Sequence, residues 1–279
     1  MPRNRGARRV CRVCLISLVF FLVASRSQIR SLRIACWVLR DEKSAEHLEA
    51  SVAISQGWGK GCDSLTFIDT LTSDIEADWD EGYHKLSSKS FRAWHYIFEK
   101  YSAADFYLKA DLDTLIFHEQ LRAYLSRFSA HEPHYIGKHF MNGDHVSFVP
   151  GATIILSRAA LLEFVGASVH NHSQCARHEF IRKGPAEDLA LGSCLNEIGI
   201  YPHNTRDRYG RERFMVFSPE FMQRGLNGTL PQWYLQFSFN TEIGRNCCSD
   251  SAISFHQVHH SDVVAQVDIF ARMSRSLSA

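Results

Sequence analysis

Two aspartates that follow an apolar stretch are the residues of this chain best suited to chemistry. Asp111 and Asp113 come directly after the segment 106–110 (FYLKA), with Leu112 between them. Because side chains alternate along extended backbone, both carboxylates would point to the same side. A hard divalent cation held by one or two carboxylates keeps coordination positions that the phosphates of a nucleotide can fill. An isolated Asp-x-Asp can also cap a turn, so the surrounding sequence has to decide between the two interpretations.

A histidine and a second acidic pair are further candidates. His256 ends the short apolar run 252–255, and its imidazole could join two carboxylates around a metal, a mixture that manganese accepts better than magnesium does. Taken alone, it could equally be an ordinary surface histidine. Glu187 and Asp188 open a predicted helix, where acidic side chains complement the helix dipole by about 0.3–1 kcal/mol. One of them could instead be a general base, if it reaches the attacking hydroxyl.

The elements that must position these residues alternate between strands and helices. The apolar patterns predict strands over 33–39, 64–69, 105–110, 152–156 and 213–217,. They predict helices over 44–56, 86–101, 157–165 and 186–198, the first with Ser44 as its N-cap,. Such alternation implies right-handed crossovers and a mostly parallel α/β sheet. Ligands of such sheets bind beyond the carboxyl ends of the strands, where Asp111 and Asp113 fall.

Composition bounds the class of protein. The chain has 279 residues, of which 45% are hydrophobic and 22% charged, which is enough apolar sequence for a substantial core. Lys and Arg (31) nearly balance Asp and Glu (30), so charge gives no case for binding nucleic acid. No internal repeat and no linker rich in Pro and Gly divides the sequence, and one large domain is the simplest account.

The N-terminus differs in kind from the rest. Residues 1–12 carry five arginines, residues 13–24 are apolar, and no acidic residue occurs before Asp41. This is typical of a membrane-targeting segment, although a spanning helix usually needs roughly 20 apolar residues. The arginines would keep that end cytoplasmic and export the remainder. We expect a short type II signal anchor, with a cleaved signal peptide as the alternative.

The cysteines agree with export. Of eight, Cys11 and Cys14 fall in the targeting segment, and the other six would favour disulfides in an oxidising lumen. Spacing suggests the pairs Cys36–Cys62 and Cys175–Cys194, with either a vicinal Cys247–Cys248 bridge or a re-pairing, because six cysteines allow 15 pairings. The sequons at Asn171 and Asn227 fit a secretory-pathway surface, and the sequence leaves open whether they are glycosylated,.

Several blocks in the same order resemble one known family. They are FYLKADLDT at 106–114, EDLALG at 187–192, and CCSD at 247–250 followed by SFH at 254–256. With these blocks the chain resembles the core 1 β1,3-galactosyltransferases, which belong to the Fringe-like β1,3-glycosyltransferases of glycosyltransferase family 31. The resemblance extends from about residue 34 to residue 258. The resemblance implies a GT-A fold with a Rossmann-like half. It also implies galactose transfer from UDP-galactose, with Mn²⁺, to the 3-hydroxyl of O-linked N-acetylgalactosamine on glycoproteins.

The resemblance also assigns roles to residues. Asp111, Asp113 and His256 match metal-binding positions, and Asp188 matches the proposed catalytic base of an inverting, single-displacement reaction. Donor-binding positions fall on Cys36, Trp37, Lys89 and Asp111. The implied organisation is a cytoplasmic tail (1–12), a signal anchor or signal peptide (13–25), a short stem (26–32), a catalytic domain (33–262) and a C-terminal tail (263–279). Such a protein would be a single-pass type II protein of the Golgi membrane, or secreted after cleavage, and a homodimer is allowed.

Departures from the family pattern affect specificity. The family's glycine-rich stretch corresponds here to 149–154 (VPGATI), a family tryptophan is replaced by Ser88, and the tryptophan-rich segment after Pro231 reads QWYLQF. Donor chemistry is therefore better founded than acceptor identity. Two alternatives stay open: a non-catalytic, chaperone-like relative, which would lose the metal motif, and a β1,3-transferase of different sugar specificity.

Overall fold

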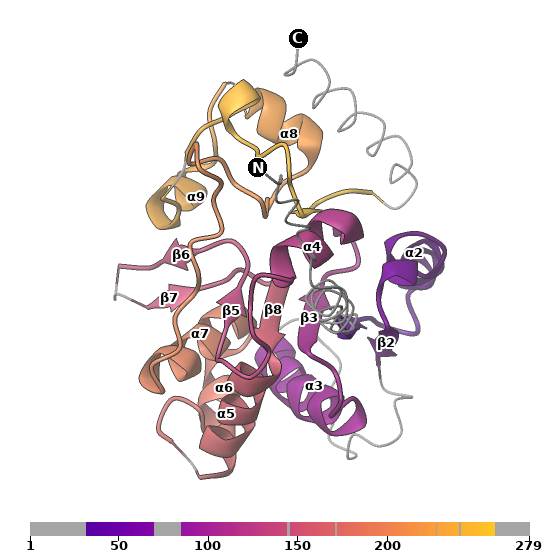
Figure 1. Cartoon of the computed structure of the whole chain (residues 1–279), viewed down its shortest axis with the longest axis vertical. Helices are drawn as coiled ribbons and strands as arrows, with labels where there is room; N and C mark the ends of the chain where they lie inside the picture. The colour runs from indigo at the N-terminus through magenta and orange to yellow at the C-terminus, as the bar shows by residue number, and fades with distance from the viewer. Residues whose placement is uncertain are drawn as a thin grey trace, which may run out of the picture. The chain divides into compact units, whose positions relative to one another are not determined.

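A five-stranded sheet lies at the centre of the domain (Figure 1). The computed structural model describes residues 32–69, 85–143, 146–170, 172–226, 228–239 and 241–259. The strand order is β2 (Ser64–Ile68), β1 (Ile34–Leu39), β3 (Phe106–Ala110), β8 (Thr153–Ser157) and β5 (Tyr135–Ile136). β2, β1 and β3 are parallel, as predicted, while β8 runs antiparallel to both β3 and β5. The sheet is therefore mixed, with a Rossmann-like parallel half.

Helices and short strands complete the domain. The longer helices are α2 (Ala45–Gln56), α3 (Leu86–Lys100), α4 (His118–Leu125), α5 (Arg158–Val169), α6 (Arg177–Lys183) and α7 (Glu187–Glu197). The shorter ones are η1 (Trp58–Gly61), α8 (Pro219–Arg224), α9 (Gln232–Phe237) and η3 (Gly244–Asn246). Two small sheets pair β4 (Leu115–Ile116) with β9 (Ser254–Phe255) and β6 (Phe140–Met141) with β7 (Ser147–Phe148).

Both faces of the central sheet are buried. On β1, Ala35 and Trp37 face a core that includes Trp94 of α3. The alternate residues, such as Cys36, face a second core that includes Phe255. Strands covered on both sides read as continuous apolar runs, which explains the unbroken pattern of 34–39. Helices α3, α5, α6 and α7 lie together in the lower half of Figure 1.

Most predicted elements are present, and one is wrong. Ser44 caps α2 by accepting a hydrogen bond from the His47 N–H. The segment 213–217 forms no strand, although residues 214–217 are buried. Single bridges connect Glu212 to Cys248 and Phe214 to Ser254. The strand that this segment meets, β9, is only two residues long. The apolar run of 213–217 therefore contributes to the core without a ladder of hydrogen bonds.

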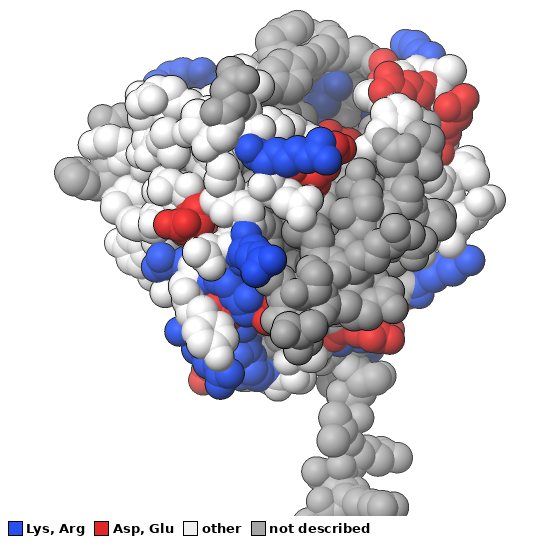
Figure 2. Space-filling model, turned by 90° about the horizontal axis from the view of Figure 1, so that it is seen from above, with Lys and Arg blue, Asp and Glu red and all other residues white. Residues whose placement is uncertain are grey.

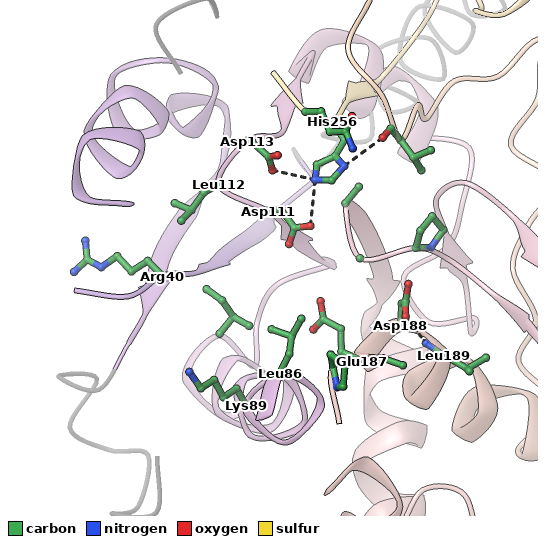
Figure 3. Close-up of a pocket in the computed structure, with 18 of the residues that line it drawn as sticks. Arg40, Leu86, Lys89, Asp111, Leu112, Asp113, Glu187, Asp188, Leu189 and His256 are labelled. Carbon is green, nitrogen blue, oxygen red and sulfur yellow. Dashed lines mark hydrogen bonds and ion pairs between the residues drawn. The ribbon is translucent and has the colours of Figure 1, made fainter. Parts of the chain in front are cut away.

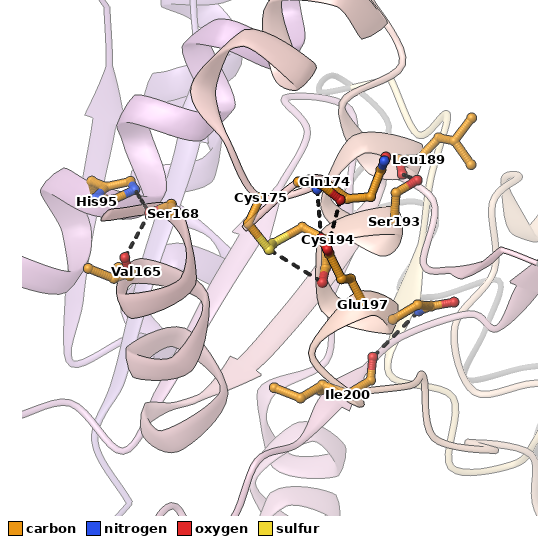
Figure 4. Close-up of a disulfide and its surroundings, with 12 residues drawn as sticks. His95, Val165, Ser168, Gln174, Cys175, Leu189, Ser193, Cys194, Glu197 and Ile200 are labelled. Carbon is orange, nitrogen blue, oxygen red and sulfur yellow. Dashed lines mark hydrogen bonds between the residues drawn. A yellow bond between two sulfur atoms is a disulfide. The ribbon is translucent and has the colours of Figure 1, made fainter. Parts of the chain in front are cut away.

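Three disulfides join the pairs Cys36–Cys62, Cys175–Cys194 and Cys247–Cys248. The two predicted long-range pairs are confirmed, and the open alternative at 247–248 is settled as the vicinal bridge. Figure 4 shows the Cys175–Cys194 bridge, which ties α7 to the segment before α6. None of the helices in the described part of the chain is long and apolar enough to cross a bilayer. The predicted anchor, most of the stem, the C-terminal tail, Asn171 and Asn227 lie outside the described residues.

We expect that alkylation of the denatured, unreduced protein labels none of the six cysteines in these bridges. By the chain-entropy model, each of the two longer loops stabilises the fold by about 3 kcal/mol. This is a large part of a typical margin of about 5–15 kcal/mol. Mass spectrometry of alkylated peptides measures the result. Labelling of four or more of the six would contradict both the pairing and an oxidising compartment.

Candidate active site

A pocket of about 1000 Å³ opens at the carboxyl ends of β1 and β3. The sheet contributes residues 39–41 at the end of β1 and residues 111–113 after β3, and the start of α7 contributes residues 185–189. This is the position at which parallel α/β sheets bind ligands. The predicted residues Lys89, Asp111, Asp113, Asp188 and His256 all line this one pocket (Figure 3).

Asp111, Asp113 and His256 lie on one side of the pocket (Figure 3). The Nε2 atom of His256 lies 2.9 Å from Oδ1 of Asp113 and 3.5 Å from Oδ2 of Asp111. One possible ligand atom from each residue lies within 4.8 Å of the others. The small sheet of β4 and β9 causes this approach, because it pairs the segment after Asp113 with the segment before His256.

The surroundings of His256 fix which nitrogen faces the carboxylates. Its Nδ1 lies 3.3 Å from the carbonyl oxygen of Val216, and because a carbonyl can only accept, Nδ1 carries the hydrogen. Nε2 is then directed at Asp111 and Asp113. Burial lowers the pKa of His256, but the hydrogen bond and charges of the two aspartates outweigh it and raise that pKa. Two carboxylates and one oriented imidazole are a donor set that fits a divalent ion such as Mn²⁺.

A buried lysine lies behind this cluster. The Lys109 ammonium donates to Oδ1 of Asp111 at 2.6 Å, to Oε1 of Glu187 at 2.5 Å and to the Gly151 carbonyl at 2.8 Å. Its side chain is 1% exposed. Glu187 is also buried and accepts a hydrogen bond from Ser90 of α3. Lys109 therefore connects Asp111 to the first turn of α7, which also carries Asp188.

Gly151 packs closely against the ion pair of Lys109 and Glu187, which would have to shift to accommodate a side chain at this position. A Cβ atom at that position would lie 2.9 Å from Oε1 of Glu187 and 3.1 Å from the Lys109 Nζ.

Burial raises the pKa of Glu187, although the Lys109 charge opposes the shift. Burial lowers the pKa of Lys109, but its two carboxylate partners outweigh this and raise that pKa, so the ammonium stays charged.

We expect Lys109→Met to lower the free energy of unfolding by about 3–5 kcal/mol, because it leaves the buried Glu187 carboxylate without its cation,. Urea denaturation followed by fluorescence measures the change. The double variant Lys109→Met/Glu187→Gln should recover a substantial part, since it removes one of the uncompensated charges. A double variant as unstable as the sum of the two single variants would show that the two side chains do not act as a pair.

Asp188 lines the pocket from the second residue of α7, on the side opposite the His256 cluster in Figure 3. Its Oδ1 accepts a hydrogen bond of 2.8 Å from the Leu189 N–H. Burial raises its pKa, while hydrogen bonds from the backbone N–H groups of Leu189 and Gly151 and the charge of Lys109 oppose the rise. A carboxylate with a raised pKa is better matched to accepting a proton near neutral pH.

Two residues assigned to donor binding do not reach the pocket, and that part of the prediction is corrected. Cys36 is fully buried and bonded to Cys62. Trp37 is fully buried, with its ring edge against Trp94 at a centroid distance of 4.8 Å. Both faces of β1 are covered, so neither side chain can touch a ligand. Strand β1 instead contributes the residues at its end, Arg40 and Asp41.

Other pocket residues were missed by sequence reasoning. Polar side chains from α2, Glu46 and His47, line one part of the pocket. A different part is aromatic, and its members are Phe140, Phe148, Trp233 and Phe237. Trp233 and Phe237 lie on α9, in the segment where the sequence departs from the family's tryptophan-rich pattern. Their apolar spacing alone could not distinguish core from pocket.

The fold and the site define the class. An α/β domain with a Rossmann-like half, and an Asp-x-Asp after a central strand, is the architecture expected of a nucleotide-sugar-dependent glycosyltransferase. A galactosyltransferase family model matches residues 69–206, which is about half of the chain. This match, and the relative described next, show similarity to galactosyltransferases, in agreement with the resemblance that the motifs indicate.

One similar protein is the glycoprotein-N-acetylgalactosamine 3-beta-galactosyltransferase 1 of Xenopus laevis, 29% identical over 247 residues. The alignment covers 84% of this chain, and this chain spans 65% of the length of that relative. Two solved structures also align. A glycosyltransferase involved in glycosylation of the major capsid of PBCV-1 has a TM-score of 0.40 and 10% identity, over 86% of this chain and 99% of that one. The galactosyltransferase LgtC with donor and acceptor sugar analogues has a TM-score of 0.41 and 11% identity, over 88% and 96%.

Proposed function

We propose that this protein is an inverting β1,3-galactosyltransferase that moves galactose from UDP-galactose to the 3-hydroxyl of O-linked N-acetylgalactosamine on glycoproteins. The observation that carries the proposal is the convergence of Asp111, Asp113 and His256 in one pocket with Asp188, in a chain that a galactosyltransferase family model matches over residues 69–206. The Xenopus relative, a glycoprotein-N-acetylgalactosamine 3-beta-galactosyltransferase by name, supports the sugar and the acceptor.

The donor side of the pocket is polar. Asp111, Asp113 and His256 would hold Mn²⁺, and a bound ion would neutralise charge that develops on the diphosphate leaving group. Arg40 and Lys89 also line this pocket, and Arg40 is paired there with the buried Asp69 at 2.6 Å. The volume of about 1000 Å³ is at the upper end of ordinary ligand pockets, which suits a nucleotide sugar together with part of an acceptor.

The acceptor side combines a base with aromatic surface. Asp188 would take the proton from the attacking hydroxyl as oxygen bonds to the anomeric carbon on the face opposite the departing UDP. One displacement inverts the configuration, so no nucleophile from the protein is needed. The rings of Phe140, Phe148, Trp233 and Phe237 offer apolar faces against which a sugar can pack. Lys109 acts indirectly, as a positioning residue that holds Asp111 and α7 in register.

Transfer by the purified full-length protein, measured with Mn²⁺ over a panel of UDP-sugars, tests the proposal. We expect UDP-galactose to be the preferred donor and a glycopeptide carrying O-linked N-acetylgalactosamine to be the acceptor. Preference for UDP-N-acetylglucosamine would replace the sugar assignment and leave the chemistry in place. Absence of both transfer and donor hydrolysis would favour the non-catalytic alternative. The presence of the metal motif argues against that alternative.

We also propose that the protein is a single-pass type II protein of the Golgi membrane, with the domain after residue 32 in the lumen. The arginine-rich start, the apolar run of 13–24 and the three disulfides support this. Protease protection of the domain in intact microsomes tests the orientation, and release of the protein into the medium would instead support a cleaved signal peptide.

A further inference from the structure

A second hollow, of about 790 Å³, lies apart from the residues of the active-site pocket. It forms where the loop 203–213 meets the end of α4 and the turn 249–251. Its charged lining residues are Arg127, Arg206, Arg208, Arg211, Arg213, Asp207 and Asp250. Five arginines against two aspartates give this hollow a formal charge of +3, whereas the whole chain carries only +1.

Both aspartates are already engaged by one arginine. Arg211 lies 2.9 Å from Asp207 and 2.7 Å from Asp250. Among the described residues, no carboxylate lies within salt-bridge distance of the other four arginines. Their hydrogen bonds go to neutral groups: the carbonyls of Tyr124 and Thr205, the Asn204 amide and the Tyr209 hydroxyl. Four guanidinium groups therefore keep charge that an anionic ligand could neutralise.

Four of the five arginines lie against two tyrosine rings. The guanidinium of Arg127 lies 4.2 Å from the centroid of Tyr124, and that of Arg213 lies 5.6 Å from the same centroid. Arg208 and Arg211 lie 4.7 Å and 5.2 Å from the centroid of Tyr209. A guanidinium that stacks on a ring keeps its N–H edge available, so a carboxylate could bind it with two parallel hydrogen bonds.

The lining of this hollow continues directly into the active site. The Arg213 carbonyl accepts from the Ile253 N–H at 2.6 Å, and the Met215 N–H donates to the Ser254 carbonyl at 2.9 Å. The next residue, Val216, holds His256. Three residues of extended chain span roughly 10 Å, so the hollow lies within a few residues' reach of the pocket. Figure 2 shows lysine and arginine side chains gathered near the lower left of the face seen from above.

We propose that the arginine-lined hollow binds acidic side chains of the acceptor polypeptide, a few residues away from the one that carries the sugar. The proposal rests on the proposed function, because it takes the acceptor to be a glycoprotein. The guanidinium groups are spread around two separate rings, which suits several carboxylates along a chain better than one compact anion. The same contacts would raise the affinity of acidic acceptors without touching the reacting atoms.

Binding of a sugar-free peptide tests the site separately from catalysis. A fluorescent ten-residue peptide with four aspartates, and the same peptide with four asparagines, are titrated with the full-length protein by anisotropy. We expect the acidic peptide to bind about tenfold more tightly at low salt, and the difference to shrink at high salt. The double variant Arg127→Gln/Arg208→Gln should abolish this preference. The matched control Arg177→Gln/Arg224→Gln removes two exposed arginines that line neither pocket and should keep it.

Transfer kinetics provide the second measurement. With glycopeptide acceptors, Arg127→Gln/Arg208→Gln should raise KM for the acidic acceptor by about tenfold, leave KM for the neutral acceptor unchanged and leave kcat within about twofold. The variant Arg127→Gln/Arg208→Lys, which keeps the charge at position 208, should show a smaller rise in KM for the acidic acceptor than Arg127→Gln/Arg208→Gln.

Equal binding of the two peptides by the wild type would overturn the proposal, as would an unchanged preference in the double variant. Inhibition of peptide binding by millimolar inorganic phosphate, without any preference for the acidic peptide, would assign the hollow to a small anion instead. If no acceptor is galactosylated but the acidic peptide still binds at this site, the proposed function fails and the anionic-peptide site stands.

Discussion

Asp113→Ala is expected to lower galactosyl transfer by on the order of 10³-fold or more while leaving the protein folded. Asp113 is half-exposed and contributes its carboxylate to the cluster with His256. Without it, a metal would lose a ligand, and the diphosphate would approach an incomplete site. Transfer with saturating Mn²⁺ measures the loss, and circular dichroism verifies the fold. Asp111→Ala should be equally inactive, but it also removes a partner of the buried Lys109, so Asp113 gives the cleaner test.

Metal binding can be measured without activity. Calorimetric titration with Mn²⁺ should show binding to the wild type and none, or much weaker binding, to Asp113→Ala. His256→Ala should weaken Mn²⁺ binding more than it lowers stability. Glu163→Ala, an exposed acid on α5 outside the pocket, is the matched control and should behave as wild type. Full transfer in excess chelator, or in Asp113→Ala, would reject the metal assignment.

The sequence could predict the parts of the fold that depend on local pattern. Strands and helices from 34 to 110 follow from apolar periodicity, and two disulfides from cysteine spacing. The proximity of His256 to Asp113 could not be derived locally, because it depends on the pairing of β4 and β9, each two residues long. The residue types alone made a shared metal site possible, the resemblance to a family assigned all three residues to it, and their role as metal ligands stays a prediction.

Buried polar contacts were the least predictable feature. Lys109 reads as one polar residue within an apolar strand, and nothing nearby in the sequence identifies Glu187 as its partner. The same limit explains the wrong assignment at β1. Family motifs mark Cys36 and Trp37, but only the packing of helices on both faces shows that these side chains are enclosed.

Asp188→Asn is expected to lower kcat by roughly 10²–10⁴-fold while UDP-galactose binding stays nearly unchanged. Asparagine keeps the shape of the side chain and the acceptor for the Leu189 N–H, but it cannot take the proton of the attacking hydroxyl. If Asp188 only stabilises the start of α7, the substitution should change stability by about 1 kcal/mol or less, and turnover should stay near normal. Single-turnover kinetics with a synthetic glycopeptide, together with donor binding by calorimetry, separate the two roles.

Glu187, the acid next to Asp188, cannot provide the control for Asp188→Asn, although adjacent side chains on a helix point in different directions. Glu187 is buried against Lys109 and Ser90, so Glu187→Gln should destabilise the protein and affect Asp111 through Lys109. Glu197→Gln is the better matched control, because Glu197 lies at the other end of α7 and outside the pocket. Loss of turnover in Asp188→Asn with normal turnover in Glu197→Gln is the expected outcome. If instead Glu187→Gln stays folded but inactive and Asp188→Asn turns over normally, Glu187 is the base rather than Asp188. Normal turnover in both variants would mean that neither carboxylate takes the proton and that the proposed mechanism is wrong.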